Sequence, residues 1–239
     1  AEMSLRTAAL DDPQAIRQAG RDLLSLALID ARNLTLRWLE VFESRTLDGA
    51  SRASGGRSPR WLAGHAGWYQ EWWIGRNPQR SRGEAGDPGG VRLASIEPRA
   101  DGWFQSGTDT VPDATAVRNY LAETLDISLD LLAVADDSDD ALHVYRAALL
   151  HEDRLGQALA EQAATLQLRR QPDPPPPLLW PPARVDREPL WLPAARLRLG
   201  SERGGFVPDN ERWADTVSVP EFEIDAQAVS WERYIEFAE

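Results

Sequence analysis

The sequence predicts a mainly α-helical protein, in which a four-helix bundle is followed by a proline-rich linker and the start of a mixed α/β domain. Three observations support this fold class. Apolar residues recur at three- and four-residue spacing over most of the first 168 residues, as on the buried face of a helix. Prolines then crowd a short segment, and beyond them apolar and polar residues alternate as in β-strands. The predicted boundaries are 5–170 for the bundle, 171–195 for the linker and 196–239 for the N-terminal part of the last domain.

The composition narrows the classes of function. Of the 239 residues 42% are hydrophobic, which is enough for a core, and the net charge of −12 disfavours a nucleic-acid partner or an anionic membrane surface. The absence of cysteine excludes disulfides, zinc fingers and iron–sulfur clusters. No apolar run approaches the ~20 residues of a membrane span, and no basic start followed by an apolar run indicates secretion. We therefore expect a cytoplasmic protein with neither a membrane nor a nucleic-acid partner.

The first two helices each begin at a capping residue followed by proline. Asp12 and Pro13 start one helix, and Ser58 and Pro59 start the other. The apolar face of the first helix comprises Ile16, Leu23, Leu24, Ala27, Leu28, Ala31, Leu34, Trp38, Leu39 and Phe42. The second helix carries Trp61, Leu62, His65, Trp68, Trp72 and Trp73. We expect the second helix to end near Pro78, because proline cannot continue it.

Two more helices follow, with loops predicted at 47–57 and 78–112. The third helix begins at Asp113, and the fourth is capped by Asp139 or Asp140. The third carries Val117, Tyr120, Leu121, Leu125, Ile127, Leu129 and Leu132. The fourth carries Leu142, Tyr145, Leu149, Leu150, Leu155, Leu159 and Ala163. Four amphipathic helices with connections of mixed length predict a four-helix bundle.

The remainder of the chain changes character twice. The linker contains Pro172, Pro174, Pro175, Pro176, Pro177, Pro181 and Pro182, too many prolines for a helix or a central strand. We expect it to be extended and semi-rigid, and to lie against another surface through its apolar residues, Leu178, Leu179, Trp180, Leu190 and Trp191. Strands are predicted around Leu197, Leu199, Val217, Val219, Phe222 and Ile224. A helix is predicted from Trp231 to Phe237. This region is too small to bury a core alone, so we expect it to belong to a longer domain.

The chemistry-bearing residues are few, and the three histidines are the first to consider. His143 and His151 lie eight residues apart on the fourth helix, or roughly 12 Å along its axis. Metal–ligand bonds of ~2 Å do not span that separation, so at most one of the two joins His65. His151 is the better candidate, because two histidines four residues apart form a common helical chelate and His151 begins such a motif. Leu155 occupies its second position. The residues therefore predict a two-histidine metal site formed by His65 and His151.

Other interpretations of these residues are more frequent in proteins generally. A single histidine on an amphipathic helix is usually a surface or core residue. The cluster Trp61, Trp68, Trp72 and Trp73 is more often part of a core than an aromatic cage for a quaternary ammonium group. Glu152 and Asp153 are more often a solvated helix face than an acid–base pair. The sequence contains neither a phosphate-binding glycine loop between a strand and a helix nor a nucleophile elbow.

Several segments resemble the family of ergothioneine-type sulfoxide synthases and selenoneine synthases. Residues 58–77, SPRWLAGHAGWYQEWWIGRN, resemble the second helix of the family's DinB-like bundle. Within them and just beyond, the sequence of residues 70–80 is most similar to the selenoneine branch. Residues 151–153, HED, match the start of the family's His-Glu-x-x-His helix. Residues 205–214 and 217–224 resemble the opening of a formylglycine-generating-enzyme-like domain. Together these segments cover nearly the whole chain in the order of the family.

The resemblance implies a fold, a cofactor and a reaction. The fold would be a DinB-like four-helix bundle followed by a formylglycine-generating-enzyme-like (C-type-lectin-like) domain, and His65 and His151 would bind Fe(2+). The activity would be oxygen-dependent joining of a selenosugar or thiol donor to carbon 2 of the imidazole of hercynine, or trimethylhistidine. Leu155 stands where the family has its third ligand. The family's catalytic tyrosine and most of its substrate pocket belong to the second domain, so catalytic and substrate-binding residues stay unassigned here.

Two alternatives remain open from the sequence. Leu155 favours a non-catalytic, metal-free DinB-like bundle that binds a small ligand. A different thiol-dependent metal transferase could also use the same bundle. The iron hypothesis requires His65 and His151 to face each other with ring nitrogens within about 8 Å, since one ion cannot bridge a larger gap.

Overall fold

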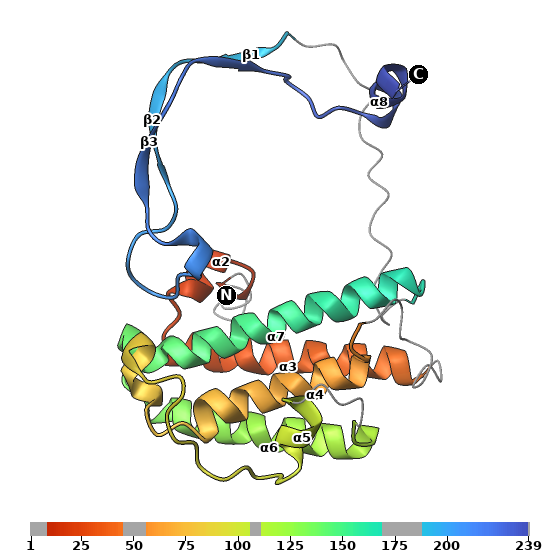
Figure 1. The fold of residues 1–239 in the computed structure, drawn as a ribbon, viewed down its shortest axis with the longest axis vertical. Helices are drawn as coiled ribbons and strands as arrows, with labels where there is room; N and C mark the ends of the chain where they lie inside the picture. The colour runs from red at the N-terminus through yellow and green to blue at the C-terminus, as the bar shows by residue number, and fades with distance from the viewer. Residues whose placement is uncertain (1–8, 45–55, 106–110, 169–187, 239) are drawn as a thin grey trace, which may run out of the picture. The chain divides into compact units, whose positions relative to one another are not determined.

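A computed structural model gives the fold, which is mainly helical with a small antiparallel β region toward the C-terminus (Figure 1). The structure describes residues 9–44, 56–105, 111–168 and 188–238. The chain divides into two compact units. The helical unit comprises Ala1–Pro174 with Gly204–Phe206, and the strand unit comprises Pro175–Arg203 with Val207–Glu239. Because 169–187 lies outside the described residues, the predicted boundaries of the linker stay a prediction.

The helical unit is built on four long helices, α3, α4, α6 and α7, which pack side by side (Figure 1). Its α-helices are α2 (Pro13–Arg17), α3 (Arg21–Glu43), α4 (Pro59–Gln70), α5 (Ala100–Phe104), α6 (Ala114–Ala133) and α7 (Asp139–Thr165). A π-helical segment, η2 (Glu71–Gly75), continues α4, and a 3-10 segment, η3 (Arg80–Ala85), follows. The apolar positions predicted from helical spacing form the core, where Leu24, Leu28, Leu121, Leu142 and Leu159 have no exposed surface. Among the described helices, none is long and apolar enough to cross a membrane.

The first predicted helix is interrupted, and this corrects the prediction. The chain forms α2 and α3 with a break before Gly20, whose backbone is extended. The guanidinium group of Arg146 donates to the carbonyl of Ala19 from Nε at 3.2 Å and from Nη2 at 2.8 Å. A distant side chain thus satisfies a carbonyl that a continuous helix would have paired, and the break is stabilised by a tertiary contact.

The predicted helix starts are confirmed in three cases and corrected in one. The side chains of Asp12, Ser58 and Asp113 each accept a backbone N–H of the first turn. The cap of α7 is Ser138, one residue before the predicted Asp139. Asp139 instead forms an ion pair of 2.7 Å with Arg146, so its carboxylate is used in tertiary packing.

The second predicted helix changes its geometry before it ends. The α-helical part stops at Gln70 and the π-helical turn η2 carries the chain to Gly75, close to the predicted end. Glu71 begins this turn with a buried carboxylate that accepts from the hydroxyl of Tyr120 and from the backbone N–H of Ile96. The predicted loop at 78–112 contains η3 and α5, while 106–110 and most of the predicted loop at 47–57 lie outside the described residues.

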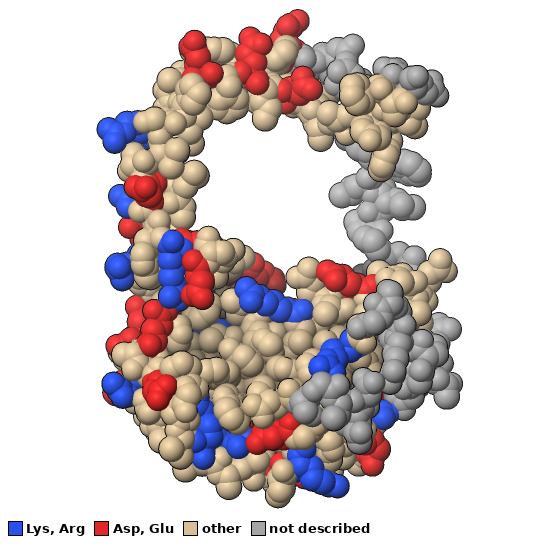
Figure 2. Space-filling model, viewed as in Figure 1, with Lys and Arg blue, Asp and Glu red and all other residues tan. Residues whose placement is uncertain are grey.

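The strand unit contains the predicted strands and one strand that the linker prediction missed. Its elements are β1 (Leu190–Leu192), β2 (Ala195–Leu199), β3 (Asp215–Val219), β4 (Phe222–Ile224), the short 3-10 turn η4 (Asp209–Glu211) and α8 (Trp231–Ala238). In the described part, β1 pairs with β4 and β2 with β3, both antiparallel. Leu178, Leu179 and Trp180, which are expected to lie against another surface, fall outside the described residues. The side chains of Leu190 and Trp191 are 53% and 58% exposed, on a strand that pairs with β4. Carboxylates gather over β1 and β4 (Figure 2), where Glu221, Glu223 and Asp225 are exposed.

Candidate metal site

His65 on α4 and His151 on α7 face each other inside the helical unit. The Nδ1 atom of His65 lies 3.3 Å from the Nε2 atom of His151. The ring centroids are 5.1 Å apart and the ring planes are inclined by 42°. The structure thus brings together the two residues that the sequence singled out, well within the distance that a shared metal ion requires.

Both imidazoles are half-buried and less basic than histidine in water. Burial lowers the pKa of His65, opposed by a backbone hydrogen bond and assisted by Arg57. Burial, the neighbouring His65 and Arg154 lower the pKa of His151 to about 4. At neutral pH both rings are therefore neutral, the form in which an imidazole nitrogen can bind a metal ion.

Aromatic side chains fix the orientation of both imidazoles. Tyr69 stacks on His151 with ring centroids 4.0 Å apart and planes inclined by 17°. Trp61 and Trp68 contact His65 edge-on, with centroid distances of 4.5 and 5.2 Å. Burial raises the pKa of Tyr69, so its hydroxyl stays protonated. The pair is therefore held by rigid rings that limit rotation of the imidazoles.

Leu155, four residues after His151, belongs to the apolar core. Leu155 is 9% exposed and packs in a cluster with Leu62 and Ala66. Asp153, a possible substitute ligand, has an exposed side chain. Within 9–44, 56–105, 111–168 and 188–238, no three His, Cys, Asp or Glu residues are placed to hold a metal ion together. The described chain therefore supplies two imidazoles to the site.

Glu152 does not lie on a solvated helix face, which corrects the sequence-based expectation. Its side chain is 1% exposed and accepts from Arg32 through Nε at 2.8 Å and Nη2 at 3.1 Å. It also accepts from the hydroxyl of Thr35 at 2.9 Å and the amide of Gln70 at 3.0 Å. Arg32 in turn donates to the carbonyl of Leu121. Because its two oxygens already accept four hydrogen bonds, Glu152 connects the four long helices and is not placed to act as an acid or base.

His143 stands apart from the pair. It lies eight residues before His151 on α7, and its ring packs against Phe206 with centroids 5.3 Å apart. It lines a cavity of about 220 Å³ together with Tyr69 and Trp73. The separation predicted from helix geometry therefore excludes His143 from the pair.

The four tryptophans support the packing interpretation that the sequence favours. Trp68 is buried and the other three are half-buried. Guanidinium groups of the protein lie over three of them, 4.5 to 5.3 Å from the ring centroids: Arg57 over Trp61, Arg76 over Trp72, and Arg92 over both Trp72 and Trp73. The four rings thus pack the unit and bind its own arginines, and they do not converge on one ligand cage.

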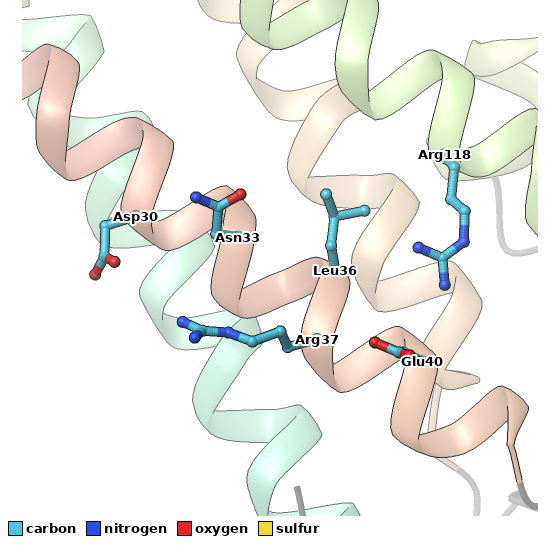
Figure 3. A pocket seen from close by; sticks show the side chains of 6 residues that line it. All are labelled: Asp30, Asn33, Leu36, Arg37, Glu40 and Arg118. Carbon is cyan, nitrogen blue, oxygen red and sulfur yellow. The ribbon is translucent and has the colours of Figure 1, made fainter. Parts of the chain in front are cut away.

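A groove of about 360 Å³ on the outer face of α3 is a weaker candidate (Figure 3). It is lined by Asp30, Asn33, Leu36, Arg37, Glu40 and, from α6, Arg118. Figure 3 shows Arg37 between Asp30 and Glu40 along the helix, so charges of both signs alternate. Arg118 is already paired with Glu43 at 2.6 Å. Alternating exposed charges are typical of a solvated helix face rather than of a convergent binding site.

Two contributors to the site region were missed at the level of sequence. Tyr69 follows His65 by four residues, so the spacing alone places both on one helix face. Arg32 stands among the apolar positions of α3, and a charge at a position that helical period buries requires a buried partner. That partner is Glu152, which follows His151 directly.

Comparison of the sequence with models of protein families and with curated proteins gave no match in either case.

Proposed function

We propose that this chain is an oxygen-dependent Fe(2+) enzyme that joins a selenium or sulfur donor to imidazole carbon 2 of hercynine. The donor would be a selenosugar or a thiol. The observation that carries the proposal is the convergence of His65 and His151, which are 86 positions apart in sequence and 3.3 Å apart in space. These two residues match metal ligands of the ergothioneine-type and selenoneine synthases.

The pair suits a metal ion in both distance and charge. Two bonds of about 2.1 Å can converge on one ion from nitrogens 3.3 Å apart. Both rings are neutral at neutral pH, because burial lowers the pKa of His65 and of His151. Imidazole is a suitable ligand for iron, so His65 and His151 would hold the ion.

The side chains have separate roles in this proposal. His65 and His151 hold the ferrous ion, which when bound supplies the capacity to bind and reduce oxygen. Tyr69 orients His151 by stacking, while Trp61 and Trp68 shield His65 from water. Joining ring carbon 2 to selenium or sulfur removes one hydrogen from each partner. Two protons and two electrons therefore leave, and oxygen is the electron acceptor.

The same proposal identifies the helical unit as a DinB-like bundle and the strand unit as the opening of a formylglycine-generating-enzyme-like, C-type-lectin-like domain. The order of elements supports it, since four long helices precede antiparallel strand pairs and a further helix. The segments that resemble the two domains fall in these units in the same order.

An anaerobic titration with ferrous iron tests the proposal. We expect one ion per chain, tighter binding in the presence of hercynine, and at least about tenfold weaker binding in His65→Ala and in His151→Ala. Binding by wild type that is unaffected by both substitutions would remove the assigned ligands. No binding with or without hercynine would remove the iron site itself. Oxygen consumption by the loaded protein, with hercynine and a selenosugar or thiol, then identifies the donor.

A second candidate is a metal-free bundle that binds a small ligand. Leu155 favours it, since the residue at the position of the third ligand is an apolar core residue. In that case the neutral rings of His65 and His151 share one hydrogen bond across 3.3 Å. Stoichiometric ferrous binding would exclude this candidate.

A further inference from the structure

The buried glutamine that ends α4 connects this helix to α7 close to the histidine pair. Gln70 has no exposed surface and follows His65 by five residues. Its amide Nε2 donates at 3.0 Å to Oε2 of Glu152, the residue directly after His151. The contact between the two imidazoles is thus accompanied by a second polar contact between the same two helices.

The two polar contacts lie on opposite edges of the α4–α7 interface. At about 100° per residue, His65 and Gln70 are roughly 140° apart around α4, and His151 and Glu152 are about 100° apart around α7. The residues between these edges pack in one apolar cluster: Leu62 and Ala66 on α4, and Leu155 and Leu159 on α7. Apolar contact has no preferred direction, so by itself it leaves the helices able to turn against each other. A hydrogen bond is directional, so the bond at one edge restricts movement at the other.

The carboxylate that Gln70 binds is fixed by a third helix. Arg32 on α3 donates to both oxygens of Glu152, and the hydroxyl of Thr35 on the same helix donates to Oε1 at 2.9 Å. Arg32 and Thr35 are both buried. These donors do not depend on α4, so they hold Glu152 whether or not Gln70 is present. The bond from Gln70 therefore sets the position of α4 against a fixed acceptor.

The amide of Gln70 has one close partner among the described residues. The hydroxyl of Ser128 lies 3.4 Å from Gln70 Oε1 but 2.8 Å from the carbonyl of Thr124, so the shorter bond of this hydroxyl is made within α6. The next residue, Glu71, accepts from other parts of the helical unit and begins the π-helical turn. The 3.0 Å bond to Glu152 is therefore the main polar contact through which Gln70 acts.

We propose that Gln70 is a positioning residue of the metal site, whose bond to Glu152 sets the separation and relative orientation of the imidazoles of His65 and His151. Without the amide, the α4–α7 interface would turn about its apolar centre, and the ring nitrogens, now 3.3 Å apart, would no longer approach one ion together. The metal-binding part of this inference rests on the proposed function. Its effect on the imidazole pair requires no metal ion.

Nitrogen NMR of the imidazoles in the metal-free protein tests the positioning directly. Gln70→Met keeps the length of the side chain but cannot donate a hydrogen bond. We expect the ring-nitrogen signals of His65 and His151 to shift in this variant, because the contact between the two rings changes. The signals of His143, which lies outside the pair, should stay in place. Unchanged signals of His65 and His151 would overturn the proposal.

Thr35→Val is the matched control. It removes a hydrogen bond from the same buried carboxylate but leaves α4 joined to α7 through Gln70. We expect it to leave the signals of the histidine pair unchanged. Equal shifts in Thr35→Val and Gln70→Met would indicate a general loosening of the buried network and overturn the assignment. If Gln70→Met loses its helical circular dichroism, Gln70→Asn, which keeps an amide but is one methylene shorter, decides the same comparison.

Anaerobic ferrous titration of the same variants extends the test to the metal ion. We expect at least about tenfold weaker binding in Gln70→Met, and binding within about twofold of wild type in Thr35→Val. Wild-type affinity in Gln70→Met would overturn the positioning role. An absence of ferrous binding by wild type would instead remove the proposed function and the metal-binding part of this inference, and the NMR comparison would still decide whether Gln70 positions the pair.

Discussion

His151 and Glu152 are neighbours on α7, yet they occupy opposite kinds of environment. Glu152 is 1% exposed and accepts hydrogen bonds from three side chains. His151 is half-buried, stacks on Tyr69 and directs a ring nitrogen at His65. Helical rotation of about 100° per residue is enough to turn one side chain into the core and the other toward a candidate site.

This difference separates stability from chemistry within one short motif. A carboxylate with all its acceptor positions occupied holds helices together and has little left to offer a ligand. A neutral imidazole whose ring nitrogen lies beside that of another neutral imidazole keeps a lone pair that a metal ion can use. Substitutions at adjacent positions should therefore affect different properties.

The largest expected effect is on folding, at Glu152. Glu152→Ala leaves the Arg32 guanidinium buried without its carboxylate, so we expect a loss of about 3–5 kcal/mol in the free energy of unfolding. Chemical denaturation followed by circular dichroism measures it. Glu161→Ala, an exposed carboxylate on the same helix, should change stability by no more than about 0.5 kcal/mol. Equal stability of the two variants would show that the buried network does not hold the helices.

The second-largest effect is expected on ferrous affinity, when a third histidine is added to the pair. Leu155→His places an imidazole one turn after His151, and we expect ferrous affinity to rise by about tenfold or more, as a third ligand joins the first two. Loss of the buried leucine should cost about 2 kcal/mol or more of stability. Anaerobic titration and denaturation of the same variant measure the two effects. Leu155→Met keeps the apolar volume and should leave affinity unchanged, so a gain in Leu155→Met would contradict the explanation.

A smaller effect is expected in the way that stability changes with pH. In metal-free protein the folded pKa of His151 is about 4, below the 6.5 of an unfolded histidine, so the unfolded state binds more protons between these values. Stability should therefore be unaffected by this group above about pH 6.5 and should fall as the pH drops from there toward about 4. The lowered pKa of His65 acts in the same direction. Denaturation at about pH 7 and about pH 5 should show a smaller difference for His151→Gln than for wild type, and an unchanged difference would argue against a buried neutral ring.

The smallest expected effect sharpens the assignment of the histidines. His143→Ala should leave ferrous affinity within about twofold of wild type, because His143 packs against Phe206 and does not join the pair. The same anaerobic titration measures it. A loss as large as that of His151→Ala would mean that all three histidines contribute to the metal site.

Local pattern accounted for much of the fold. Apolar spacing and the caps at Ser58 and Asp113 predicted helices that the structure confirms. The break before Gly20 was missed, because apolar spacing continues in phase across it and the stabilising contact comes from Arg146 on α7. The start of α7 was ambiguous, since Ser138 and Asp139 are both favoured caps and only the ion pair with Arg146 distinguishes them.

The candidate site was likewise predicted only in part from the sequence. Helix geometry alone separated His143 from His151, and the choice of His65 as the partner of His151 agrees with their 3.3 Å approach. The partner of Glu152 could not be read from α7, because it lies on α3, and only the packing of the two helices brings Arg32 to it. Leu155, where the resemblance would place a third ligand, is part of the apolar core.

The π-helical turn η2 lies between His65 and Arg76, which pairs with Asp101. A π-helical turn contains about one more residue than a turn of regular α-helix. Arg76, just past this turn, binds Asp101 through two hydrogen bonds of 2.8 and 3.2 Å. Deleting a single residue within η2 would restore regular α-helical winding and leave the residues after it close to their present orientation relative to His65, because the wider turn already takes up the extra residue. Regular α-helical winding of the same residues, with none deleted, would instead rotate Arg76 away from Asp101 while leaving the histidine pair in place, so the wider turn keeps this ion pair aligned.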